Sequence, residues 1–227
     1  MTTLAEYDSK RVLKPWGSEY VVYRDKKKIS ITLLNITKNK TTSFHCHPSK
    51  KTGFILLSGK AIVRLGLEKR DKIKFKAISK LMIRPGLFHS IRSLSKNFIA
   101  LEFETPSNKR DLVRLYDNYG RKNKPYENQK KNLKKLSINE LKFEKPKYNI
   151  SKKYIIGSNS IFLENHFNFS KTNKRPNDEI YAVLEGNVID KKRNKVLSVG
   201  DIVRNETLKK LSKSFKINSK IIFLRVI

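Results

Sequence analysis

The chain has 227 residues, of which 38% are hydrophobic and 10% aromatic, with one cysteine and a formal net charge of +31. These values argue against disorder across the whole chain and exclude an internal disulfide, and no apolar run approaches the ~20 residues of a membrane helix. The first ten residues also lack the apolar core of a signal peptide, so we expect a soluble cytoplasmic protein with no membrane span.

Short strands separated by turn signals are expected through the first hundred residues. An N-terminal arm, residues 1–13, leads to a turn at Lys14-Pro15-Trp16-Gly17. Segments rich in β-branched and aromatic residues then span 19–24, 28–36, 41–47, 53–58, 60–67, 72–78, 80–84, 89–93 and 97–104. Many short strands at this spacing predict an all-β sandwich or barrel of the jelly-roll kind.

The pattern changes after residue 105. Apolar residues at helical spacing follow Asn108, a candidate N-cap, and predict a helix over 108–116. Residues 121–153 form a polar, strongly basic connector, with a short helix expected at the capping-box sequence of residues 137–140. We interpret the connector as a linker that wraps the first β domain, and the alternative is a disordered basic segment.

Strand patterns resume at residue 153. The expected strands span 154–156, 160–164, 179–184, 187–190, 201–204 and 220–226. We therefore divide the chain into a first β domain of residues 1–120, a basic linker of residues 121–152 and a second β domain of residues 153–227.

Two of the four histidines lie two residues apart in one expected strand. His45 and His47 would project to the same face, with Cys46 pointing the opposite way. His89 follows the turn at Pro85-Gly86, at the start of another strand. Three imidazoles brought together in this way are a ready ligand set for one divalent metal ion, and Fe, Mn, Ni, Co and Zn all accept such ligands.

These residues resemble the two motifs of the cupin superfamily. In the first motif, His45 and His47 are followed by Thr52 in the place of a Glu and by Gly59. In the second, Ser79 stands in the first Gly place and Arg84 in the Pro place, before Gly86 and His89. The resemblance covers about residues 14–105. It implies a cupin-type jelly-roll β-barrel with a three-histidine metal site, in which water or substrate completes the shell.

The second half resembles a cupin that has lost its metal ligands. Glu179 through Gly186 fits the end of the first motif, and Gly200 begins a segment similar to the second. Asn173 and Arg175 stand where the histidine pair would be, and an arginine has no lone pair to donate to a metal. The resemblance therefore implies a bicupin with a degenerate second half, which forms a smaller barrel or completes the first one through strand exchange. We expect it to serve as a structural or dimer-forming unit.

Two acidic and two basic residues are candidates for chemistry beside the metal. Glu102 and Glu104 lie two apart in one strand, so both face the site or neither does. Either of them, or a metal-bound hydroxide, could act as the general base, and a solvated strand edge is the alternative for the two glutamates. Lys51 and Arg84 could bind an anionic group of the substrate, although a solvated lysine is the simpler explanation for Lys51 and its neighbour Lys50.

The net charge admits three explanations. A polyanion partner such as nucleic acid would use a gathered basic surface, but the cations here are scattered through strands and loops. We therefore favour a composition bias toward Lys, Asn and Ile and do not expect nucleic-acid binding. A phosphorylated substrate, which needs only a few local cations, is the third explanation.

The function expected from the resemblance is metal-dependent chemistry on a carbohydrate. Pro15-Trp16-Gly17 resembles the segment before the cupin barrel of sugar-phosphate isomerases. This implies an isomerase or epimerase that acts on a small, anionic sugar or sugar phosphate in surface-carbohydrate biosynthesis, with a homodimer as the expected assembly. The alternatives are an iron-dependent dioxygenase or lyase that acts on a small acid, and a sugar-binding module without activity.

Overall fold

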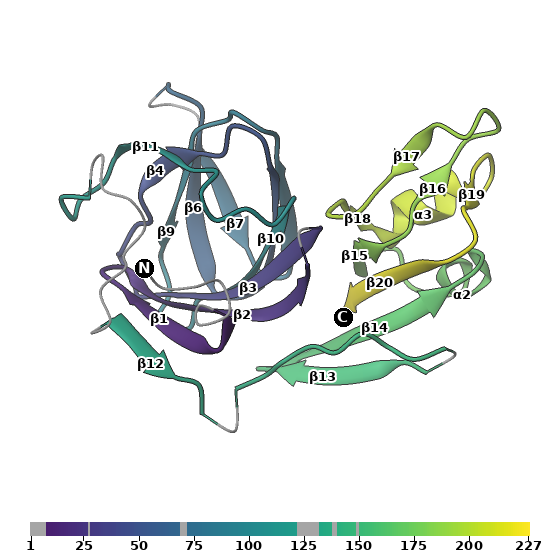
Figure 1. Cartoon of the computed structure of the whole chain (residues 1–227), viewed down its shortest axis with the longest axis horizontal. Helices are drawn as coiled ribbons and strands as arrows, with labels where there is room; N and C mark the ends of the chain where they lie inside the picture. The colour runs from purple at the N-terminus through teal and green to yellow at the C-terminus, as the bar shows by residue number, and fades with distance from the viewer. Residues whose placement is uncertain (1–7, 27, 69–71, 122–131, 138–139, 149) are drawn as a thin grey trace. The chain divides into compact units, whose positions relative to one another are not determined.

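The computed structural model describes residues 8–26, 28–68, 72–121, 132–137, 140–148 and 150–227 (Figure 1). The chain divides into two compact units. The first comprises residues 1–79 and 83–142, and the second comprises residues 80–82 and 143–227. The expected linker, residues 121–152, is thus shared between the two units.

Two antiparallel sheets contain the strands up to residue 135. The strands are β1 (Lys10–Lys14), β2 (Gly17–Asp25), β3 (Ile29–Ile36), β4 (Phe44–Cys46), β5 (Lys51–Ser58), β6 (Lys60–Leu65), β7 (Lys72–Lys76), β8 (Ser79–Ile83), β9 (His89–Ser93), β10 (Ile99–Thr105), β11 (Val113–Tyr116) and β12 (Leu133–Lys135). A seven-stranded sheet has the order β12-β1-β2-β3-β10-β5-β8, and a five-stranded sheet has the order β11-β4-β9-β6-β7. The predicted all-β jelly-roll fold is confirmed.

The helix predicted over residues 108–116 is wrong. The structure has strand β11 there, which pairs with β4 through Val113 opposite Cys46 and Arg114 opposite His45. The apolar spacing of this segment is compatible with a helix, but the edge of β4 offers unpaired backbone groups, and pairing with them overrides a weak local preference. This pairing brings a distant segment beside the histidine strand.

The second expected helix, at residues 137–140, falls partly outside the described residues, because 138 and 139 are not among them. The Ser137 backbone N–H donates to a carboxylate oxygen of Glu140 at 2.8 Å. This is the reciprocal half of a capping box, but neither residue 137 nor residues 140–148 are helical.

The second unit contains two further sheets and two short helices. Its elements are β13 (Lys152–Ile156), β14 (Asn159–His166), α2 (Ser170–Asn173), β15 (Ile180–Glu185), β16 (Val188–Ile189), β17 (Lys195–Leu197), β18 (Ile202–Arg204), α3 (Asn205–Leu211), β19 (Lys216–Ile217) and β20 (Ile221–Val226). The sheets have the orders β13-β14-β20-β15-β18 and β17-β16-β19. Tyr181, Val183, Leu208 and Phe223 are fully buried in the core of this unit.

The strand order of the second unit repeats that of the first. The series β13-β14-β20-β15-β18 corresponds to β2-β3-β10-β5-β8, and β19-β16-β17 corresponds to β9-β6-β7. A glycine at positive φ follows β5 (Gly59) and its counterpart β15 (Gly186). Gly59 comes seven residues after Thr52, and Gly186 comes seven residues after Glu179. Helix α2 occupies the place in the chain that β4 has in the first unit. The second unit is therefore a jelly-roll repeat that lacks the histidine strand.

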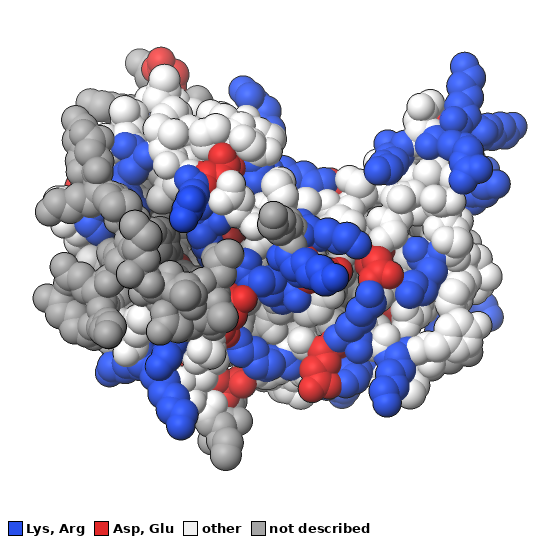
Figure 2. All heavy atoms as spheres, viewed as in Figure 1, with Lys and Arg blue, Asp and Glu red and all other residues white. Residues whose placement is uncertain are grey.

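Lysine and arginine side chains cover much of the molecular face shown in Figure 2, with fewer aspartates and glutamates among them. In the described part of the chain, no helix has the length and apolar character needed to cross a membrane.

Candidate metal centre

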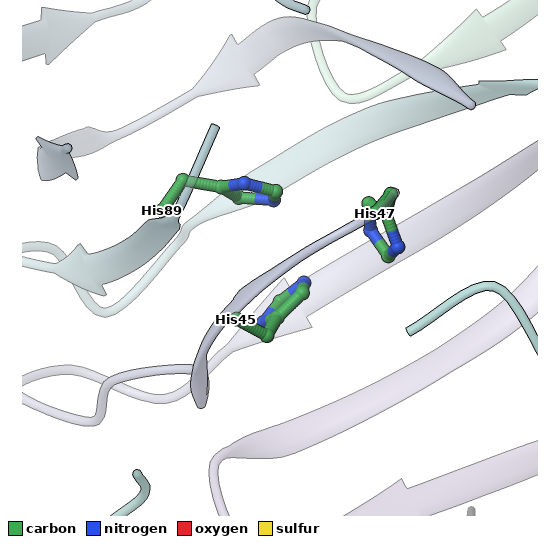
Figure 3. A group of neighbouring side chains, drawn as sticks. All are labelled: His45, His47 and His89. Carbon is green, nitrogen blue, oxygen red and sulfur yellow. The ribbon is translucent and has the colours of Figure 1, made fainter. Parts of the chain in front are cut away.

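Three histidines from two paired strands lie together in the first unit. His45 is in β4, His47 directly follows it, and His89 begins β9, where its Cα is the antiparallel partner of that of His45. The ring centroids are 4.9 Å apart for His45 and His47, 4.5 Å for His45 and His89, and 5.5 Å for His47 and His89. Figure 3 shows the three rings turned toward a common space. One potential ligand atom from each lies within 4.8 Å of the others.

Each imidazole is held by a backbone carbonyl through its Nδ1. The Nδ1 of His45 lies 2.9 Å from the carbonyl oxygen of Ser43. For His47 the partner is the carbonyl of Asp111 at 2.6 Å, and for His89 it is the carbonyl of Leu87 at 3.0 Å. Because a carbonyl only accepts hydrogen bonds, each Nδ1 carries the proton and each Nε2 keeps a lone pair. The jelly-roll topology and these three oriented rings together decide the fold family.

The first unit has the cupin fold.

The cupin site fits a divalent metal ion. The His89 Nε2 is buried and has no hydrogen-bond partner among the described residues, which would cost free energy unless a ligand occupied its lone pair. Burial lowers the pKa of His45 well below its ordinary value, and the nearby His89 and His47 lower it further. Burial is also the main cause that lowers the pKa of His47 to about 3 and that of His89 to about 4. All three rings are therefore neutral at pH 7, as metal coordination requires.

Asp111 was missed by the sequence analysis, although it orients the first motif. Its carboxylate accepts hydrogen bonds from the backbone N–H groups of Ser49, at 3.1 Å, and Lys50, at 2.9 Å. Its carbonyl holds the Nδ1 of His47. One residue thus fixes both the ring of a candidate ligand and the loop that follows it.

Both predicted acidic residues face the cupin pocket. Glu102 of β10 is opposite Phe54 of β5, and Glu104 is opposite Thr52. Cross-strand partners share a face of the sheet, and Phe54 lines the pocket together with both glutamates. The buried Thr52 hydroxyl oxygen has no hydrogen-bond partner among the described residues. Glu104 therefore places a carboxylate next to the position where the cupin motif has its Glu.

The two glutamates have different partners. Glu104 forms an ion pair with Lys50, a second with Lys109 at 3.0 Å, and a hydrogen bond from the Ser30 hydroxyl at 3.3 Å. Burial would raise the pKa of Glu104, but Lys109 and Lys50 outweigh it and hold that pKa well below the ordinary value. Within the described chain, Glu102 has no ion pair or hydrogen bond of its side chain. Burial first, and the charge of Glu104 second, raise the pKa of Glu102 to about 8.

A pocket surrounds these groups, with an empty volume of about 680 Å³ that is partly open to solvent. Its lining residues are Lys14, Trp16, Glu19, Leu34, Thr42, Ser43, His45, His47, Lys50, Phe54, His89, Ile91, Glu102, Glu104, Lys109, Leu112, Arg114 and Arg121. The last four come from the segment that follows β10. The sequence pattern predicted a helix and a linker there and gave no signal that Lys109, Arg114 and Arg121 line the pocket.

The predicted substrate-binding residues Lys51 and Arg84 are not among the residues that line the pocket. Lys51 is adjacent to Thr52 in β5, and alternation along the strand gives it the face opposite the pocket. Arg84 is exposed in the turn before β9. Of the neighbouring lysines Lys50 and Lys51, it is Lys50 that lines the pocket, and only 2% of its side chain is exposed.

In the second unit, ion pairs involve Arg175 and Glu179, two of the residues that correspond to the first cupin motif. Glu164 accepts hydrogen bonds from the Arg175 guanidinium at 2.6 and 3.1 Å and from the Arg225 guanidinium at 3.0 Å. Arg225 also donates to Glu179 at 2.9 Å. Arg175, predicted to stand in a ligand place, thus forms a structural ion pair.

No protein-family profile and no curated protein sequence matches the chain. Among solved structures, the chain is similar to KdgF from Halomonas sp., with 12% identity over 47% of this chain and 94% of that one, at a TM-score of 0.40. It is also similar to a Klebsiella pneumoniae protein with a double-stranded β-helix domain. The identity is 16% over 52% of this chain and 97% of that one, and the TM-score is 0.39. A third similar structure is the capsular polysaccharide assembling protein CapF from Staphylococcus aureus. The identity is 17% over 45% of this chain and 31% of that one, and the TM-score is 0.39. The chain thus spans about a third of CapF, and the assignment of the fold rests on the strand topology and histidine geometry described above.

Proposed function

We propose that the cupin unit is a metal-dependent enzyme that moves a proton on a small, anionic sugar or sugar phosphate, as an isomerase or epimerase of surface-carbohydrate biosynthesis. The observation that carries the proposal is the cluster of three imidazoles, each with a potential ligand atom within 4.8 Å of the others, in a pocket that is also lined by Glu102. Carbonyl isomerisation requires polarisation of the carbonyl oxygen, which a bound metal ion can supply, and a group that transfers the proton.

His45, His47 and His89 would hold one divalent ion, and neutral imidazoles suit Fe, Mn, Ni, Co or Zn. When bound, such an ion would supply a Lewis acid that polarises a carbonyl or hydroxyl oxygen of the substrate. The carbonyls that hold each Nδ1 orient the rings. Preorganised ligands of this kind need little rearrangement on binding.

Glu102 is the residue that we assign to proton transfer. It lines the pocket, and its carboxyl is not committed to a partner among the described side chains. With a pKa of about 8, it is largely protonated at pH 7, so the ionised fraction, which grows as the pH rises, takes a proton from a substrate carbon and the resulting acid returns it. Glu104 has a different role, because Lys50 and Lys109 hold it in ion pairs. We assign Glu104 to positioning these two lysines in the pocket.

The charge of the pocket supports an anionic substrate. Five of its lining side chains are Lys or Arg, and three are Glu. A bound divalent ion would add to this excess of positive charge. A phosphate or carboxylate group on the substrate would balance it. Arg114 and Arg121 share the carboxylate of Asp117 as an ion-pair partner, and because each guanidinium has five N–H donors, an anionic group can bind beside that carboxylate.

Elemental analysis and deuterium exchange test the proposal together. We expect about one divalent metal ion per chain, and exchange of a carbon-bound hydrogen of a sugar phosphate with deuterium from solvent. Glu102→Gln should retain the metal and lose the exchange, whereas the exposed Glu206→Gln, in the second unit, should retain both. A protein without metal would instead support the sugar-binding alternative, and bound iron with oxygen uptake would support the dioxygenase.

Two expectations from the sequence stay predictions, namely a homodimer and a cytoplasmic location. Light scattering on the purified protein tests the first, and cell fractionation tests the second.

A further inference from the structure

The outer face of the five-stranded sheet gathers six cations. We name it the basic face, and its residues are Lys60, Arg64, Lys72, Lys74, Lys76 and Arg92. Their sequence neighbours Ala61, Val63, Phe75 and Ile91 are buried on the opposite face of the same strands. Alternation along β6, β7 and β9 therefore directs all six basic side chains outward. Arg64 is half-buried, and the other five are exposed.

Four of these cations form two directly opposed pairs. Lys60 is the cross-strand partner of Lys76, and Arg64 is the partner of Lys72. Like charges in directly opposed positions destabilise a sheet. Strands β6, β7 and β9 contain no Asp or Glu, and within the described chain the five exposed cations make no side-chain ion pair. The arrangement costs stability in the isolated protein, and an anion bound across the face would remove that cost.

Protection of a sheet edge explains only part of this surface. Strand β7 is the edge of its sheet, and lysines there discourage pairing with another chain. Strands β6 and β9 are interior strands, however, and Lys60, Arg64 and Arg92 lie on them. The cations scattered in the sequence are thus collected by the fold across three adjacent strands.

We infer that the basic face binds single-stranded nucleic acid through its phosphate backbone. The face measures roughly 10 by 13 Å, from a strand spacing of about 4.8 Å and a rise of about 3.3 Å per residue. A flexible single strand can fold over so small an area and place a phosphate near each cation, whereas a rigid duplex meets a flat sheet along a line. The sequence analysis did not expect this binding, because strand register is invisible in the order of the lysines.

An aromatic ring beside the basic face supports nucleic acid over other polyanions. Tyr116 of β11 is 43% exposed, and the Arg64 guanidinium carbon lies 5.8 Å from its ring centroid. Arg64 also hydrogen-bonds to the Tyr116 hydroxyl group. An exposed ring braced by a guanidinium is a stacking surface for a base, and an acidic glycan has no π-face to stack on it.

Salt-dependent binding of a fluorescent oligothymidylate of about 12 nucleotides to the full chain tests the inference. With six cations engaged, the affinity should fall about 300-fold between about 50 and about 200 mM salt. The triple variant Lys74→Gln, Lys76→Gln, Arg92→Gln should reduce that fall to about 20-fold, because three phosphate contacts are lost. Retention of metal and of the circular dichroism spectrum shows that the variant is folded.

The matched control removes the same charge elsewhere. Lys191, Lys192 and Lys195 are exposed in the β16–β17 hairpin of the second unit, and their replacement by Gln should leave the fall in affinity near that of the unmodified protein. If both triple variants weaken binding equally, bulk charge is responsible and the inference is overturned. The same holds if the oligonucleotide does not bind.

Replacement of the ring separates nucleic acid from an acidic glycan. Tyr116→Ala should weaken oligothymidylate binding about five-fold or more, while Tyr116→Phe retains the ring and the affinity. Heparin, used as a competitor, should be insensitive to Tyr116→Ala. If heparin binds more tightly than the oligonucleotide and Tyr116→Ala affects neither, the basic face belongs to an acidic glycan and the inference is overturned.

Discussion

Replacing Glu164 with Gln should destabilise the second unit by about 3 kcal/mol. The carboxylate of Glu164 accepts hydrogen bonds from two guanidinium groups, those of Arg175 and Arg225. An amide of the same shape would leave Arg175 without an anion and Arg225 with Glu179 alone. Breaking a buried pair costs about 3–5 kcal/mol. We take the lower end because 23% of the Arg175 side chain is exposed and can be hydrated.

Hydrogen exchange of the β14 and β20 amides measures this loss. A destabilisation of about 3 kcal/mol corresponds to exchange about 100-fold faster in the amides that require unfolding of the unit. The matched control is Glu206→Gln, since Glu206 is exposed and its ion-pair partner among the described residues is Lys210, one helix turn away. A change below about five-fold for Glu164→Gln, which is about 1 kcal/mol, would refute the assigned role of the buried ion pairs.

The pH dependence gives an independent test of the same contact. Burial would raise the pKa of Glu164, but hydrogen bonds from His166 and Arg175 and the charge of Arg225 outweigh it and hold that pKa well below the ordinary value. The stabilisation is therefore complete above the unfolded-state pKa of about 4.3 and is lost as the pH falls toward the folded-state pKa. The difference between the unmodified protein and Glu164→Gln should be constant from about pH 6 to 8 and shrink below about pH 4.

Three further predictions concern the metal site and the repeat. The double variant His45→Ala, His89→Ala should lose the metal measured by elemental analysis, whereas Glu179→Gln should leave it unchanged; retained metal in the double variant would contradict the ligand assignment. Asp111→Ala should weaken metal binding about 10-fold in a chelator competition, because the carboxylate that fixes the loop after His47 is lost, while the backbone carbonyl that holds the His47 ring remains. Gly186→Ala should cost at least about 2 kcal/mol in urea unfolding, because φ is +81° and a Cβ would lie 2.1 Å from a backbone carbonyl oxygen; an unchanged midpoint would contradict this.

The sequence could predict the histidines because their signal is local. The spacing of His45 and His47 fixes a shared strand face, and the turn before His89 marks the start of another strand. Alternation along the strand also predicted that Glu102 and Glu104 share one face of the sheet, and in the structure this face lines the pocket.

The remaining parts of the site depend on strand register and on pairing at a distance. The choice between Lys50 and Lys51 follows from where β5 begins, and sequence patterns define such boundaries to within a few residues only. Arg114 reaches the pocket because β11 pairs with the edge of β4. In the second unit, Glu164 and Arg225 meet through the β14–β20 pairing. Neither contact leaves a periodic signal in the sequence.

The bond between His47 and the carbonyl of Asp111 joins residues 64 positions apart. During synthesis, His45 and His47 leave the ribosome long before residue 111, so the ring of His47 has no fixed orientation at that stage. Closing so long a loop has an entropic cost that the pairing of the intervening strands must first offset. The metal would therefore enter a barrel that is already folded. It would not act as a template for folding, which distinguishes this protein from small domains that are unfolded without their ion.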